Sequence, residues 1–193
     1  MRVVEDESQL IIDACRGSVS AFEALVVLYE PRIRRMLYSM TRDVQLTQDL
    51  CQESFLAAYR ALHRMDGEEL HFAPWLYRIA LNQLRSEWRR RKHVTLVPFP
   101  APYGSDDDAS SEEYFMCDGN FEEVVSECDL VRRVLSHLPA TSVMCLLLDA
   151  EGFTYKEIAE IMHDSLSAVR SRLARARQSF QRLYARLDQE RRS

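Results

Sequence analysis

The sequence predicts an all-α protein made of two small helical domains joined by an acidic flexible linker. Only 5 Gly and 6 Pro occur in 193 residues, so long segments run without a helix breaker. Within these segments apolar residues recur every three or four positions, which is the spacing of one helix face. Between residues 93 and 131 there is no Lys or Arg, whereas acidic residues are frequent. The predicted parts are a first domain (1–96), a linker (97–121) and a second domain (122–193).

The first domain is expected to be a four-helix bundle with its own core. A short helix over 8–16 precedes a longer one, for which Ser18 or Ser20 is the expected cap. A third helix over about 45–64 carries an apolar stripe that predicts burial of one face. The fourth helix is expected to open at Pro74, because proline suits a first helical position.

Residues 97–121 are rich in Pro, Ser and Asp. Such a composition cannot bury enough apolar surface to order itself, which predicts a solvated tether. Helical periodicity resumes at about residue 122. A further helix is expected between Pro139 and Gly152, before the last two helices.

The clearest local signal lies at 154–178. Thr154 and Glu157 have the spacing of a capping box, which marks the start of a short helix. A turn over 163–165 follows, and Ser165 is placed to cap a last helix that carries arginines on its outer faces. A short helix, a tight turn and a basic helix predict a helix-turn-helix that enters a DNA major groove. The alternatives are an arginine-rich solvated surface helix and a coiled-coil stalk, although a stalk does not explain the capped helix before it.

The segment LPATSVMCLLLDAEGFTYKEIAEIMHDSLSAVRSRLARAR resembles the promoter-binding C-terminal domain of extracytoplasmic-function (ECF) RNA polymerase sigma factors. This sequence has His163 and Ser167 where glycine is common in that family, and Ala168 where threonine is common. The resemblance implies that this domain has the helix-turn-helix fold and that it binds the −35 promoter element. The contacts that it implies come from Thr154, Tyr155, Ser165, Ser167, Ala168, Arg170, Ser171, Arg172, Arg175 and Arg177.

Two segments of the first domain resemble the same family. DLCQESFLAAYRAL is similar to the helix by which sigma factors grip a coiled coil of RNA polymerase. The resemblance implies polymerase binding by Asp49, Gln52, Glu53 and Leu56. By spacing alone, the first three form a polar patch opposite the apolar stripe, so an ordinary solvated face is an open alternative.

FAPWLYRIALNQLRSEWRRRKH resembles the family's helix that recognises and opens the −10 element. Its basic end suits phosphates, and an aromatic ring there could stack on an unpaired base. The loop 65–73 would help to form the pocket for a flipped base. Trp88 could instead belong to the core, and Asn82 could be an incidental surface amide. The implied −10 contacts are His71, Asn82, Arg85, Trp88, Arg89, Arg90, Arg91 and Lys92.

The sequence contains no catalytic constellation, no metal-ligand spacing and no cofactor motif, so we expect a binding protein rather than an enzyme. The 5 cysteines are expected to be reduced, and no signal peptide or membrane insertion is expected, which predicts a cytoplasmic protein. The resemblance implies core RNA polymerase, promoter DNA and an anti-sigma factor as partners. The alternatives are a free-standing helix-turn-helix regulator, which would bind DNA without polymerase, and an adaptor that binds no DNA.

Overall fold

The computed structural model describes residues 7–94 and 121–192, with side chains over 7–91 and 128–192. Within these ranges the chain forms eight α-helices and no strand, which confirms the all-α prediction. The expected linker (97–121) lies outside the described residues except for its last residue, which begins α5. The helices are α1 (Glu7–Cys15), α2 (Val19–Thr41), α3 (Val44–Leu62), α4 (Phe72–Val94), α5 (Phe121–Ser136), α6 (Ala140–Ala150), α7 (Tyr155–Met162) and α8 (Leu166–Arg192).

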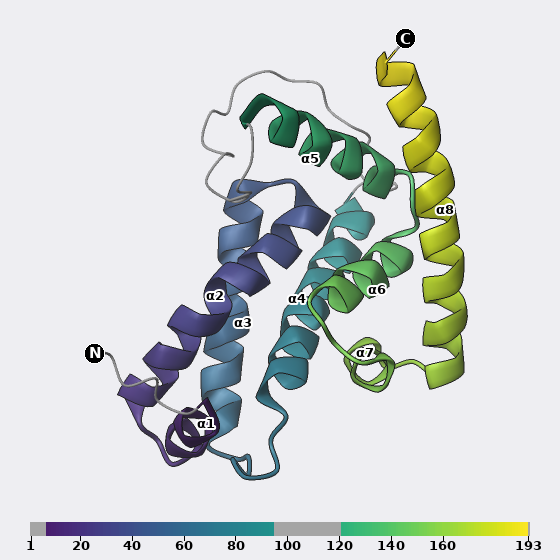
Figure 1. The fold of residues 1–193 in the computed structure, drawn as a ribbon. Helices are drawn as coiled ribbons and strands as arrows, with labels where there is room; N and C mark the ends of the chain where they lie inside the picture. The colour runs from purple at the N-terminus through teal and green to yellow at the C-terminus, as the bar shows by residue number, and fades with distance from the viewer. Residues whose placement is uncertain (1–6, 95–120, 193) are drawn as a thin grey trace.

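Helices α1 to α4 form the bundle that the sequence predicts (Figure 1). The Ser18 hydroxyl accepts a hydrogen bond from the backbone N–H of Ala21 at 3.3 Å and caps α2. Helix α4 begins at Phe72, two residues before the expected start at Pro74. Proline is tolerated there because the N–H groups of a first helical turn have no partner within the helix.

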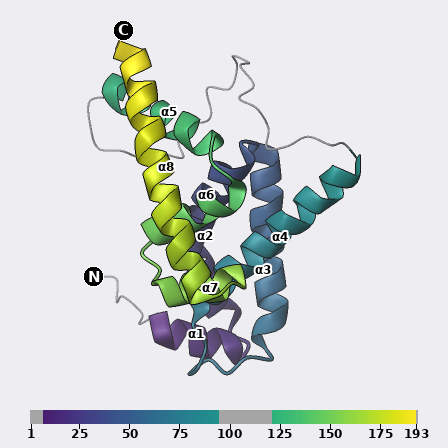
Figure 2. The ribbon, with the colours of Figure 1, turned by 90° about the vertical axis from the view of Figure 1, so that its right-hand side faces the viewer.

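Helices α5 to α8 form the second half of the molecule. Helix α8 runs along one side, where it packs against α6, α7 and α5 (Figure 2). Leu130 and Val134 of α5 bury Leu187 near the C-terminal end of α8 in a small separate cluster. This contact orders the distal part of α8, well beyond the helix-turn-helix.

The buried side chains of the two halves form one continuous apolar cluster, so the core of the bundle extends to α6 and α7. Helix α4 packs against α7, and α2 packs against α6. Leu84 of α4 and Ile158 of α7 are both fully buried in the same apolar cluster. An amphipathic pattern shows that a face will be buried, but it does not show which helix will cover it.

Gly67, in the connection between α3 and α4, lies tightly against the backbone of α1. A Cβ atom added to it would lie 2.7 Å from Ile12 Cα, and backbone cannot move aside as a side-chain tip can. We expect Gly67→Ala to destabilise the fold by about 1–3 kcal/mol, as overpacking does. Urea unfolding would measure this loss. Glu69→Ala, at an exposed position in the same connection, should change stability by less than about 0.5 kcal/mol.

Candidate functional site

An apolar groove runs between α2 and α3 on the outer side of the bundle. It has a volume of about 770 Å³, and its lining includes Phe22, Val26 and Val27 of α2 with Phe55 and Leu56 of α3. Val27 is 77% exposed and Leu56 is 44% exposed. Large apolar side chains left in water along a groove indicate a surface that a partner covers.

The four residues with a predicted role in polymerase binding lie on two sides of the exposed face of α3. Gln52 and Leu56 line the groove, whereas Asp49 and Glu53 are exposed outside its lining. The Asp49 carboxylate accepts a hydrogen bond from Gln45 at 3.1 Å. The face therefore combines an apolar strip with an acidic edge.

Helix α2 contributes half of this groove, and none of its residues was among the predicted polymerase contacts. The spacing of Val26 from Phe22 and Tyr29 is that of one helix face, yet Val26 lies in the groove lining together with Val19 and Val27. A signal was present: Val26, Val27 and Leu28 are three consecutive apolar residues, and a helix cannot bury all three on one face. Leu28 is 46% exposed, on a part of α2 outside the groove lining.

The basic end of α4 is less positive than its run of arginines suggests. Glu87 accepts hydrogen bonds from Arg90 at 2.8 and 3.0 Å and from Arg91 at 2.8 Å. These bonds hold the pKa of the Glu87 carboxyl below its usual value. Arg89 donates to Ser86 at 3.1 Å. Lys92 belongs to α4, but its side chain lies outside the described residues.

The middle of α4 presents candidate residues of unequal exposure. Asn82 is exposed, and its oxygen accepts a hydrogen bond from Arg85 Nη1 at 3.3 Å. Arg85 also contacts the sulfurs of Met144 and Met162, at 3.9 and 3.2 Å. Burial lowers the pKa of Arg85. Trp88 packs against the core with part of its surface exposed.

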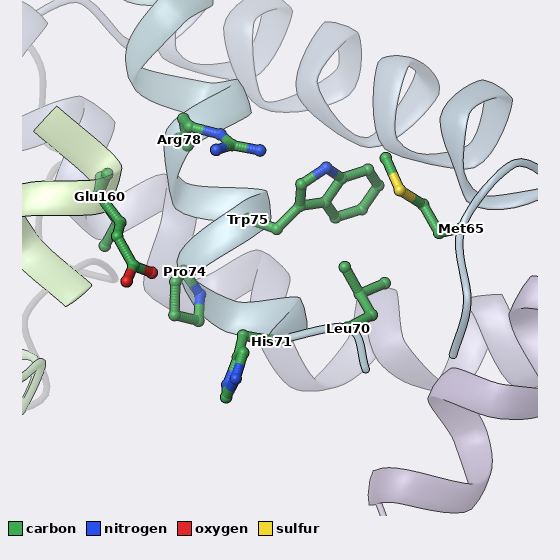
Figure 3. Close-up of a pocket in the computed structure, with 8 residues that line it drawn as sticks. Met65, Leu70, His71, Pro74, Trp75, Arg78 and Glu160 are labelled. Carbon is green, nitrogen blue, oxygen red and sulfur yellow. The ribbon is translucent and has the colours of Figure 1, made fainter. Parts of the chain in front are cut away.

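A cavity of about 230 Å³ lies where the loop before α4 meets that helix. Figure 3 shows Trp75 between Arg78 and the loop residues Met65 and Leu70. The lining of the cavity also includes the exposed His71. Arg78 was absent from the predicted contacts, although its place in this lining brings a cation to the cavity. A signal for this cation was present in the sequence, because Arg78 is the first basic residue of α4, before the basic stretch 85–92.

Helices α7 and α8 form the predicted helix-turn-helix. The capping box is present: the backbone N–H of Glu157 donates to the Thr154 hydroxyl at 3.3 Å, and the N–H of Thr154 donates to the Glu157 carboxylate at 2.8 Å. Ser165 caps α8, because its hydroxyl accepts from the N–H of Ala168 at 3.1 Å. Ser167 lies 3.1 Å from the Ser165 hydroxyl. The first turn of α8 is therefore fixed by its own side chains.

The four arginines of α8 that were predicted to contact DNA fall into two groups. Arg172 pairs with Asp164 at 2.6 Å. Arg177 pairs with both oxygens of Asp149, at 2.8 and 2.6 Å, and donates to the Tyr155 hydroxyl at 2.9 Å. Arg170 and Arg175 are exposed, and so is Ser171 between Arg170 and Arg172. The geometry gives Arg172 and Arg177 a part in holding the domain together, and leaves Arg170 and Arg175 facing outward.

His163 ends α7 in the left-handed conformation, with φ 55°. A residue with a Cβ loses roughly 1–2 kcal/mol there, whereas glycine adds only about 0.5–1 kcal/mol of conformational entropy cost. We therefore expect His163→Gly to stabilise the protein by about 0.5–1 kcal/mol, measured by thermal or urea unfolding. His163→Ala keeps the Cβ and should give no such gain; an equal gain from alanine would contradict this explanation.

In the described part of the chain no cluster of His, Cys, Asp or Glu is arranged to hold a metal ion. None of the described helices is long and apolar enough to cross a membrane.

Comparison with known proteins gives matches in both halves of the chain. Residues 25–94 match the family Sigma-70 region 2, and residues 128–180 match Sigma-70, region 4. The RNA polymerase sigma-H factor of Pseudomonas aeruginosa is 32% identical over 189 residues, covering 93% of this chain and 94% of that protein. The ECF RNA polymerase sigma-E factor of Escherichia coli (strain K12) is 34% identical over 176 residues, covering 85% and 86%.

Solved structures give the same fold. CnrH, in complex with the cytosolic domain of CnrY, has a TM-score of 0.66 at 25% identity, covering 94% of this chain and 97% of CnrH. The sigma factor RpoE of Bartonella quintana, in complex with the anti-sigma factor NepR, has a TM-score of 0.62 at 23% identity, covering 86% and 97%. The chain belongs to the ECF RNA polymerase sigma factors of the sigma-70 family.

Proposed function

We propose that this protein directs core RNA polymerase to promoters by binding the enzyme and two promoter elements at once. The observation that carries the proposal is the match of region 2 to residues 25–94 and of region 4 to residues 128–180, in that order on one chain. Binding the enzyme and two promoter elements requires one protein-binding surface and two DNA-binding surfaces, and the groove, α4 and the helix-turn-helix are candidates for these three. The polymerase supplies the chemistry, and this chain supplies binding and positioning in the cytoplasm.

The polymerase contact is assigned to the exposed face of α3 together with the groove beside α2. Leu56 and Val27 offer apolar area to a partner helix, and Gln52 offers a polar contact at the groove lining. Asp49 and Glu53 add an acidic edge, which favours a partner with basic residues beside its apolar stripe. A coiled-coil helix with such a face fits a groove of this shape.

The −10 contact is assigned to α4 and the loop before it. The cavity beside Trp75 and Arg78 combines an aromatic wall with a cation, which suits an unpaired base and its phosphate. His71 and Asn82 offer polar contacts at exposed positions. The arginines at the end of α4 attract the DNA backbone, with Arg89 in the more favourable position because Glu87 engages Arg90 and Arg91.

The −35 contact is assigned to the helix-turn-helix. Arg170 and Arg175 are the residues most suited to reading bases or phosphates, since both are exposed on α8. Thr154, Ser165 and Ser167 lie exposed at the starts of α7 and α8, where hydroxyls and helix N-termini bind phosphate. Arg172 and Arg177 act here as positioning residues, through their pairs with Asp164 and Asp149.

We also infer that an anti-sigma factor binds this protein. CnrH, whose structure matches 94% of this chain, was solved in complex with the cytosolic domain of a second protein, CnrY. The groove between α2 and α3 is a suitable place for such a partner, because a helix bound there would compete with polymerase.

Run-off transcription tests the proposal. Core RNA polymerase and the DNA upstream of the chain's own gene are combined with and without this protein, and a defined transcript is expected only with it. Binding of the same DNA by the protein alone is measured in parallel. Specific binding without polymerase, together with no transcript, would instead establish a free-standing helix-turn-helix regulator.

A further inference from the structure

A network of hydrogen bonds between the two halves of the molecule centres on Glu151, just after α6. Its carboxylate accepts hydrogen bonds from Arg32 at 2.9 Å, from Arg35 at 2.8 Å and from the Tyr77 hydroxyl at 3.0 Å. The two arginines belong to α2 and the tyrosine to α4, so one side chain of the second half joins two helices of the first. We call these four residues the Glu151 latch.

The latch is built to hold a charged carboxylate away from water. The Glu151 side chain is only 12% exposed, and burial alone would raise its pKa. The hydrogen bonds from Arg35 and Arg32 outweigh that effect and hold the pKa below its usual value. Phe153 packs edge-on against Tyr77, with ring centroids 4.8 Å apart. A buried carboxylate without partners would be costly at this place. Arg32, Arg35 and Tyr77 supply those partners only while the two halves are packed together, which we call the docked arrangement.

In this arrangement the second half covers part of the surface assigned to the −10 element, at Arg85 and at the cavity beside Trp75. Arg85 of α4 lies against the sulfurs of Met144 and Met162, which places a candidate DNA-binding cation under α6 and α7. Glu160 and Ile161 of α7 form one wall of the cavity beside Trp75. Figure 3 shows Glu160 beside Pro74 at this wall, where its carboxylate would repel a DNA phosphate.

The docked arrangement is also incompatible with binding two promoter elements. Elements centred 10 and 35 base pairs upstream lie roughly 85 Å apart on straight B-DNA at about 3.4 Å per base pair. Helices α4 and α7, which belong to the two DNA-binding halves, are in direct contact here. The halves must separate before both elements can be bound.

We propose that the Glu151 latch is an autoinhibitory contact, which biases the free protein toward a closed form and hides part of the −10 surface, Arg85 and the cavity beside Trp75, until the halves separate. The surface that it releases on opening comprises Arg32, Arg35 and Arg85. The occlusion of DNA rests on the proposed function, whereas the closure itself does not. Separate measurements therefore test the two parts.

Charge reversal at the latch tests closure. Glu151→Lys places a third cation beside Arg32 and Arg35, and we expect small-angle X-ray scattering to show a larger radius of gyration than for the wild type. Glu190→Lys is the matched control, since Glu190 is exposed near the end of α8 and lies 3.8 Å from its partner Arg186. Circular dichroism confirms that helix content is kept in each variant.

A second substitution separates the latch from simple damage to the fold. Adding Arg35→Glu to Glu151→Lys restores an opposite charge pair and should return the radius of gyration toward the wild-type value. A Glu151→Lys variant as compact as the wild type would overturn the latch, and so would an expanded variant that Arg35→Glu fails to close.

The occlusion is tested with a fluorescent single-stranded oligonucleotide of mixed sequence and no polymerase. We expect Glu151→Lys to bind it several-fold more tightly than Glu190→Lys, although both variants gain the same charge. Equal affinity of an expanded Glu151→Lys protein and the control would overturn the occlusion. Run-off transcription by the wild type is independent of either result, so a failed latch and a failed function are distinguishable.

Discussion

Leu56→Arg is expected to abolish binding to core RNA polymerase at concentrations where the wild type binds fully. Leu56 is 44% exposed on α3 and lines the groove with Phe55 and Val27. A buried apolar anchor at the centre of an interface contributes at least about 2 kcal/mol, or roughly a thirty-fold change in affinity. An arginine there would also have to lose water on binding, which adds to the loss.

Leu28→Arg is the control for this experiment. Leu28 is 46% exposed on α2, outside the groove lining, so the chemical change and the initial exposure are matched. Affinity for core polymerase is measured by fluorescence anisotropy of labelled protein, and unfolding by urea is measured for both variants. Equal losses of affinity in the two variants would remove the groove from the interface.

The double substitution Arg170→Ala with Arg175→Ala is expected to remove recognition of the −35 element while leaving the domain folded. Each residue is exposed on α8, and a side chain that reads a base contributes about 1–3 kcal/mol. If one of them contacts phosphate instead, all promoters should weaken alike, and the slope of log affinity against log salt should fall by about 1 for that contact. Competition between promoter and random DNA for the polymerase complex separates these cases.

Arg182→Ala is the control for charge, since Arg182 is exposed on α8 far from its first turn. Arg177→Ala is a control of another kind. It removes the pair with Asp149, so it should lower the stability of the domain as well as DNA binding. A double variant that unfolds as readily as Arg177→Ala would show that Arg170 and Arg175 are structural.

Much of the local structure could be predicted from the sequence because it depends on short-range interactions. The Thr154 capping box requires only the spacing of a hydroxyl and a carboxylate along four residues. The turn residue His163 adopts the backbone region that glycine favours, and glycine is common at this position in the family. The start of α4 was misplaced by two residues, because Pro74 is compatible with several positions of a first turn.

The roles of the individual arginines could not be predicted in the same way. Arg170, Arg172, Arg175 and Arg177 look alike in sequence, and all were expected to contact DNA. Only the folded domain places Asp164 beside Arg172 and Asp149 beside Arg177. Asp149 is 28 positions before Arg177, so no local pattern indicates that pair.

The sequence by itself determined the helices, their caps and the family, because these depend on periodicity, on capping within a few residues and on motifs that stand in order along the chain. Only the tertiary structure decided that α4 and α7 would share a core and that Glu151 would lie between Arg32 and Arg35. Glu151 lies 119 positions from Arg32 and 116 from Arg35 along the chain. Apolar burial is non-directional, so the side chains available on each face, rather than their spacing, select which helices meet.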